Sequence, residues 1–179
     1  MTRIILLNKP YGVLSQFTSD SDAKTLKTLI AEPGFYPAGR LDKDSEGLMI
    51  LTDDGNVQSQ ISDPKYKKQK VYAVQVEGHI ETTQVERLKE GVVLKDGPAK
   101  AIEARIISQP MLWDRIPPIR ERRNIPTTWI EITLNEGKNR QIRRMTAKIG
   151  HPTLRLVRIS IANWSLGNLQ PGESTVLTI

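Results

Sequence analysis

An arginine and three carboxylates lie within seven residues of one another in the segment 39–55, which reads GRLDKDSEGLMILTDDG. Arg40 and Asp42 are two positions apart, so an extended backbone would direct both side chains to the same side. A carboxylate beside an arginine stays ionised at neutral pH and could act as a nucleophile or as a base. The same residues would also suit an exposed, salt-bridged turn in which Ser45 and Glu46 are solvated. The residue types alone leave both interpretations open.

The composition favours a polyanionic partner and argues against chemistry that depends on cysteine or histidine. The chain has 179 residues and a formal net charge of +6, a balance that favours polyanionic partners, above all nucleic acid. There are no cysteines, which excludes disulfides, thiol nucleophiles and thiolate metal sites. The two histidines, His79 and His151, are isolated, so a histidine zinc site or a Ser-His-Asp triad has little support. No apolar run reaches about 18 residues, so we expect no membrane span.

Elements that could position such residues follow from the hydrophobic periodicity. Two segments, 80–91 and 139–150, have the spacing of helices, each ended by a glycine. Alternating or continuous apolar patterns predict strands over 3–10, 47–55, 68–78, 99–108, 128–137, 154–163 and 174–179, with Asp54-Gly55 as a closing turn. Many strands and few helices, joined mostly by short turns, indicate an α+β fold on a largely antiparallel sheet.

The segment 139–150, NRQIRRMTAKIG, is the clearest helix. At about 100° per residue, its buried stripe consists of Ile142, Met145 and Ile149. The opposite side would carry Arg140, Arg144 and Lys148, either as a solvated face or as phosphate contacts. Arg143 lies at the border between the two faces, where a partly buried arginine needs an anion.

One segment, 109–129, lies between two predicted strands and holds four prolines. It is too rich in proline for a helix or a central strand and too long for a hairpin turn. Long loops of this kind are functional or disordered, and the apolar residues Met111, Trp113 and Ile119 argue against disorder. Its positive charges are Arg115, Arg120, Arg122 and Arg123.

The segment 39–55 resembles the signature of the pseudouridine synthases that modify ribosomal RNA. Three further segments resemble the remaining motifs of this family in the same order: LNKPYGVLSQ (7–16), KVYAVQVEG (70–78) and the stretch 136–173 that begins EGKNRQIRRM. RQIRRM followed by LRLVRISIAN is similar to the small-subunit-type branch. The resemblance implies an α+β fold with a largely antiparallel central β-sheet, flanking helices and a central RNA-binding cleft. It also implies one catalytic domain over residues 1–179, with two lobes sharing one sheet and no S4 domain.

The same resemblance implies a set of site residues. Asp42 would be the catalytic residue, supported by Arg40 and paired with Arg143, and Tyr72 would stack on a uracil extruded from the RNA. Leu156 is our best match for the apolar residue that lines the pocket, with Leu154 as the alternative. The RNA-binding residues would be Arg115, Arg120, Arg122, Arg123, Arg140, Arg144 and Lys148.

The expected activity is the isomerisation of one uridine to pseudouridine, with 23S ribosomal RNA as the partner. Asp42 would either attack C1′ or take a proton from C2′, and the sequence does not choose between these routes. We expect a cytoplasmic monomer with no cofactor, no metal and no membrane association. Two other classes compete: a non-catalytic RNA-binding module, and a glycosidase in which Asp44 or Glu46 supplies a second carboxylate.

Overall fold

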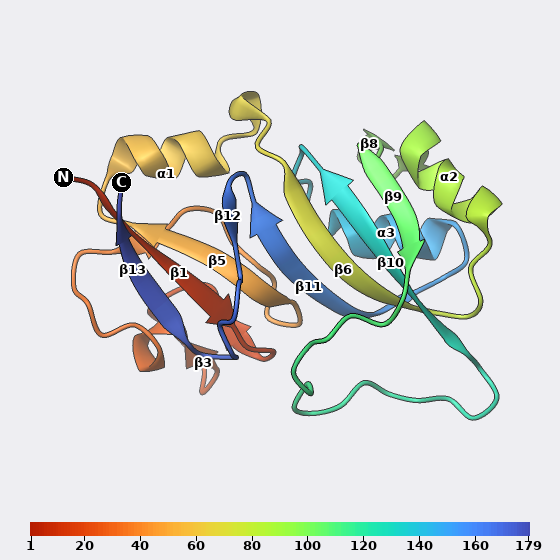
Figure 1. Ribbon diagram of the computed structural model, residues 1–179, viewed down its shortest axis with the longest axis horizontal. Coiled ribbons are helices and arrows are strands. Elements are labelled where there is room, and N and C mark those ends of the chain that lie inside the picture. Colours follow the sequence, from red (N-terminus) through yellow and green to blue (C-terminus); the bar gives the residue numbers. More distant parts are fainter. The chain divides into compact units, whose positions relative to one another are not determined.

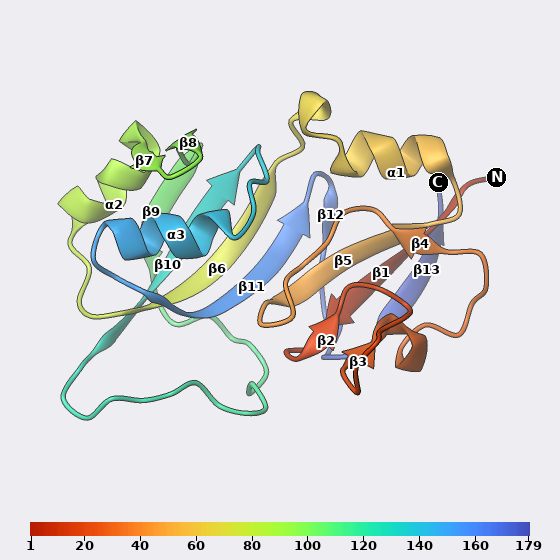
Figure 2. The same ribbon diagram turned by 180° about the vertical axis from the view of Figure 1, so that it is seen from behind.

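The structure, a computed structural model, describes every residue from Met1 to Ile179 (Figure 1, and from behind in Figure 2). The chain forms two compact units. The first unit contains Met1–Lys68 and Arg158–Ile179, and the second contains Gln69–Val157. Strand β11 (Thr153–Ile161) therefore contributes its beginning to the second unit and its end to the first. None of the helices has the length and apolar character needed to cross a membrane.

The first unit is built around strand β1 (Arg3–Lys9), which pairs antiparallel with β5 (Glu46–Thr52) on one side and with β13 (Ser174–Thr178) on the other. Every residue of β5 is buried, and so is β1 from Ile4 onward. Such strands are covered on both faces, which explains their continuous apolar sequences. The smaller elements are β2 (Val13–Leu14), β3 (Lys24–Thr25), η1 (Leu26–Thr28), β4 (Tyr36–Pro37), α1 (Gly55–Ser62), η2 (Pro64–Tyr66) and β12 (Trp164–Ser165).

The second unit is a sheet covered by two helices. Its strands are ordered β11, β6 (Lys70–Glu77), β10 (Thr127–Leu134) and β9 (Glu103–Ile107), and β10 runs antiparallel to both of its neighbours. Helices α2 (Thr82–Glu90) and α3 (Gln141–Lys148) lie on one face of this sheet together with the hairpin of β7 (Val92–Leu94) and β8 (Gly97–Ala99) (Figure 2). The predicted alternation of β6 is confirmed, because Tyr72, Val74 and Val76 all belong to the core beneath these helices.

Two local predictions are wrong. Asp54-Gly55 does not form a closing turn but is the start of helix α1. The Asp54 side chain accepts hydrogen bonds from the backbone of Asn56 (2.8 Å) and Val57 (3.3 Å), so it caps the N-terminus of α1. Arg140 does not lie on the exposed face of α3, because the helix begins only at Gln141 and Arg140 has a left-handed backbone with φ 49°. The buried stripe of Ile142, Met145 and Ile149 is confirmed.

Candidate active site

The loop that carries Asp42 is held in the first unit by hydrogen bonds to its backbone. The hydroxyl of Ser15 donates to the Leu41 carbonyl and accepts from the Leu41 amide at 3.0 Å. The Gly12 amide donates to the Lys43 carbonyl at 2.8 Å, and the Ser45 amide donates to the Asp42 carbonyl at 3.0 Å. The backbone of the loop is therefore fixed on both sides of Asp42, whose side chain is exposed.

Arg40 and Asp42 flank a buried leucine in this loop. Leu41 between them is 7% exposed and packs into the core of the first unit, whereas both charged side chains are exposed. The Arg40 guanidinium donates to the side chain of Gln16 at 3.1 Å. Arg40 thus ties the loop to the segment that follows β2.

Beneath the loop lie buried charges that the sequence did not reveal. Lys9 is fully buried, and its ammonium donates to the carbonyls of Pro10 (2.8 Å) and Lys43 (3.4 Å). Burial lowers the pKa of Lys9 from 10.5 to about 8, although the carboxylates of Glu46, Asp44 and Asp42 oppose this shift. The only signal was a lysine at the end of the apolar run IILLNKP.

The solvated interpretation of this stretch is wrong for two of its residues. Ser45 is 2% exposed and Glu46 is 1% exposed. A carboxylate buried this deeply requires compensating charge, and the attraction between Glu46 and Lys9 provides it. The arginine and the three carboxylates of this stretch therefore differ in burial. Arg40 and Asp42 are exposed, Asp44 is half-buried and Glu46 is buried.

Lys9 gives the stability of the protein a predictable dependence on pH. The folded pKa lies below the unfolded value, so the folded protein loses this proton first, and stability rises as the pH increases from about 8 to 10.5. In Lys9→Met this gain is absent. We expect the unfolding free energy of the wild type to gain up to about 3 kcal/mol relative to the variant across this range. Urea titrations at several pH values would measure it, with Lys27→Met as a control for the loss of one exposed charge. A difference that does not change with pH would contradict the prediction.

Gly47, at the end of the loop, is required by a close backbone approach. Its φ is 109°, and a Cβ there would lie 2.6 Å from the backbone nitrogen of Arg158 on β11. Arg158 is itself 4% exposed, and its guanidinium donates to the Leu48 carbonyl at 2.8 Å. No side chain fits at position 47 without separating β5 from this part of β11.

Three further predicted site residues belong to the second unit. Tyr72 on β6 and Leu156 on β11 are buried in the same core cluster, together with Ile142 of α3. Arg143, the next residue of α3, is half-buried, as its border position predicts. Leu154 instead lines a hollow of about 210 Å³ with Gln75, Glu77 and the loop after β9. Leu156 therefore shares the core cluster of Tyr72, and Leu154 lies outside it.

The proline-rich segment forms the long connection between β9 and β10 (Figure 1). Two arginines fasten it to β11. The Arg115 guanidinium donates to the carbonyls of Pro117, Pro118 and Leu154, and Arg155 donates to the Trp113 carbonyl at 2.9 Å. Arg155 also lies over the Trp113 ring. Arg115 therefore has a role within the fold, whereas the other three loop arginines are exposed: Arg120, Arg122 and Arg123.

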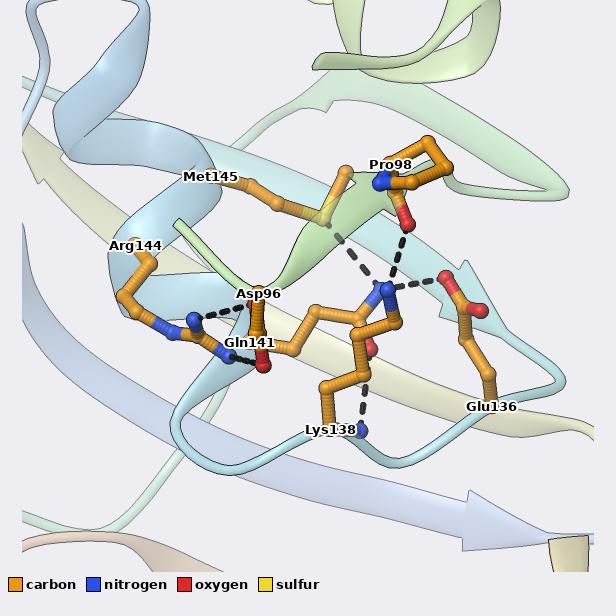
Figure 3. A network of polar contacts seen from close by, with 7 residues as sticks. All are labelled: Asp96, Pro98, Glu136, Lys138, Gln141, Arg144 and Met145. Carbon is orange, nitrogen blue, oxygen red and sulfur yellow. Dashed lines mark hydrogen bonds and ion pairs between the residues drawn. The ribbon is translucent and has the colours of Figure 1, made fainter. Parts of the chain in front are cut away.

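The predicted RNA-binding residues in and next to α3 differ in their exposure. Arg140 and Lys148 are exposed. Arg144 is half-buried and forms an ion pair with Asp96, at the tip of the β7–β8 hairpin, with an Nη1–Oδ1 distance of 2.8 Å (Figure 3). This bond holds the pKa of Asp96 below its usual value. Arg122 contacts Glu77 at 3.6 Å.

Comparisons with known proteins agree with the fold and with the motifs. This chain belongs to the RNA pseudouridylate synthase family, whose pattern matches residues 3–148. It is similar to the ribosomal large subunit pseudouridine synthase E of Vibrio parahaemolyticus, with 53% identity over 96% of this chain and 72% of that protein. The protein of the same name from Xanthomonas campestris pv. campestris is 51% identical over 95% of this chain and 92% of its own length.

A solved structure extends the agreement to the fold. A crystal structure of a pseudouridylate synthase matches 99% of this chain and 71% of its own, with a TM-score of 0.78 and 28% identity. The predicted α+β fold and the predicted family are therefore confirmed. The protein is an enzyme, an isomerase of the pseudouridine synthase type.

Proposed function

We propose that this protein converts one specific uridine of 23S ribosomal RNA to pseudouridine. The observation that carries the proposal is the exposed carboxylate of Asp42, on a loop fixed through its backbone, within the segment that matches the family. Relatives that share about half of their residues with this chain are named ribosomal large subunit pseudouridine synthases. This substrate implies that the enzyme acts in the bacterial cytoplasm.

The reaction needs one ionised carboxylate and no net redox change. The bond between uracil N1 and ribose C1′ breaks, the base turns, and a bond forms between C5 and C1′. The hydrogen on C5 leaves to solvent, and N1 gains a proton. Asp42 is proposed to drive bond cleavage, either by attack on C1′ or by removing a proton from C2′. We propose a monomer that uses neither a cofactor nor a metal.

The other site residues have proposed roles that follow from their chemistry. Tyr72 is proposed to stack on the extruded uracil, with Leu156 as an apolar wall beside it. This role requires that the Tyr72 ring, which is 9% exposed in the free protein, becomes accessible when RNA binds. Arg143 is proposed as the counter-charge of Asp42. Arg40 supports the loop through Gln16. The buried pair of Lys9 and Glu46 keeps that loop in place.

The direct test is release of tritium from C5 of uridine. Labelled 23S ribosomal RNA and labelled 16S ribosomal RNA would be incubated separately with the purified protein. We expect tritium release from 23S RNA at one site per molecule and none from 16S RNA. Release from 16S RNA alone would overturn the proposed substrate. The same assay would be repeated with partly assembled ribosomal particles. If neither RNA released tritium in either form, the proposal that this protein modifies ribosomal RNA would be wrong.

The exposed loop arginines are proposed to contact RNA phosphates. Replacing Arg120, Arg122 and Arg123 together by Ala should weaken RNA binding. The slope of log K against log salt concentration should become less steep by about 0.7–0.9 for each phosphate that the variant no longer neutralises. The fold should persist because these side chains are exposed. Binding isotherms at several salt concentrations would measure the slope. The control replaces three other exposed cations of the second unit, Arg87, Lys95 and Lys100, and an equal change in slope there would show that only net charge matters.

A further inference from the structure

Helix α3, which carries Arg143, is attached to the β7–β8 hairpin by a set of polar contacts (Figure 3). Arg144 forms two hydrogen bonds with the Asp96 carboxylate, at 2.8 and 3.3 Å. The ammonium of Lys138 donates to the Pro98 carbonyl of β8. The Lys100 amide, just after β8, donates to the Glu136 carboxylate at 3.3 Å. The hairpin thus contacts both the helix and the turn that leads into it.

Gln141, the first residue of α3, closes that turn. It is 3% exposed, and both ends of its amide are used. Its Nε2 donates to Glu136 at 2.6 Å, and its Oε1 accepts from the Lys138 backbone at 3.1 Å. Because Arg140 before it has a left-handed backbone and provides no side-chain cap, these bonds define where the helix begins.

The two attachments lie on either side of Arg143 in the sequence of the helix. Gln141 sets the start of the helix, and the Asp96–Arg144 pair restrains its rotation one residue after Arg143. Successive side chains on a helix are separated by about 100°, so a rotation of α3 would redirect the Arg143 guanidinium. The buried residues Ile142 and Met145 fix which face of the helix packs on the core, and the two hydrogen bonds of the ion pair add a directional contact.

We propose that the β7–β8 hairpin positions Arg143 for catalysis, with Asp96 and Gln141 as its positioning residues. This inference rests on the proposed function, and it assigns Arg144 to the support of Arg143 and not to the RNA phosphates. Because partly exposed ion pairs contribute little to stability, we expect the Asp96–Arg144 pair to affect the orientation of the α3 side chains more than the free energy of unfolding.

Asp96→Asn is the main test, because it is nearly isosteric and removes only the charge. A matched control is Glu131→Gln, which breaks a similarly exposed pair with Arg105 (3.1 Å) on β9 and β10 of the same unit. We expect Asp96→Asn to lower kcat by about 3- to 10-fold. This loss is smaller than the roughly 100-fold that follows when a catalytic group is displaced by 1 Å, because the variant only loosens the orientation of Arg143. KM and the salt dependence of binding should not change. Glu131→Gln should retain wild-type kcat, and the exchange Asp96→Arg with Arg144→Asp should restore part of the loss.

A competing role for Arg144 makes the opposite prediction. If Arg144 bound a phosphate, Asp96→Asn would release it from its partner. RNA affinity would then rise, the salt slope would increase by about 0.7–0.9, and kcat would stay unchanged. That result would overturn the inference, and so would equal kcat values for Asp96→Asn and Glu131→Gln.

A second measurement does not depend on activity. The side-chain Nε–H resonance of Arg143, observed by NMR in the free protein, should shift in Asp96→Asn and in Gln141→Met but not in Glu131→Gln. An unmoved resonance would overturn the inference even in an active enzyme. An inactive wild type with a shifted resonance would instead contradict the proposed function and leave the positioning by the hairpin supported.

Discussion

Replacing Asp42 by Asn should abolish pseudouridine formation and leave a folded protein that still binds its RNA. The change is nearly isosteric, and hydrogen bonds that involve Ser15, Gly12 and Ser45 hold the backbone of the loop. Loss of the anion removes both proposed routes, nucleophilic attack and proton abstraction. RNA affinity should persist or rise slightly, because a negative charge near the phosphates is removed. Tritium release and RNA binding would be measured on the same preparation.

The control for Asp42→Asn is Asp44→Asn in the same loop. Asp44 is half-buried and contributes to the charge around Lys9, so its loss should affect stability more than turnover. If Asp42→Asn retained as much as a tenth of wild-type turnover, Asp42 could not be the catalytic group. Asp44 and Glu46 would then be the next carboxylates to test.

Arg143→Ala should reduce turnover far more than RNA affinity. As the proposed counter-charge of Asp42, Arg143 would act on the catalytic carboxylate and not on a phosphate. Its loss could cost several kcal/mol of transition-state stabilisation if the pair is desolvated. Single-turnover rates at saturating enzyme would separate this loss from any change in binding.

Lys148→Ala is the matched control for Arg143→Ala, because it removes an exposed positive charge from the same helix. It should leave the single-turnover rate unchanged and alter only binding. Equal losses of binding and turnover in Arg143→Ala would show that Arg143 contacts RNA as an ordinary cation.

Sequence alone determined the features of this protein that depend on residues close together along the chain. The apolar patterns of β1, β5 and β6 and the helical spacing of α2 and α3 predicted these elements, because the side-chain period is a local property. The motifs and their order predicted the family, which the comparisons confirm. The β7–β8 hairpin was not recognised, because its strands are only three residues long and lie beyond the reach of periodicity.

The tertiary structure alone decided the partners and burial of the charged side chains. Lys9 reaches a carbonyl 34 positions away, and Arg144 reaches a carboxylate 48 positions away. Glu46 and Asp42 are four residues apart in one polar stretch, yet one is buried and the other is exposed. The physical reason is that the environment of a charge depends on the surfaces that folding brings around it, which residue types and local spacing do not encode.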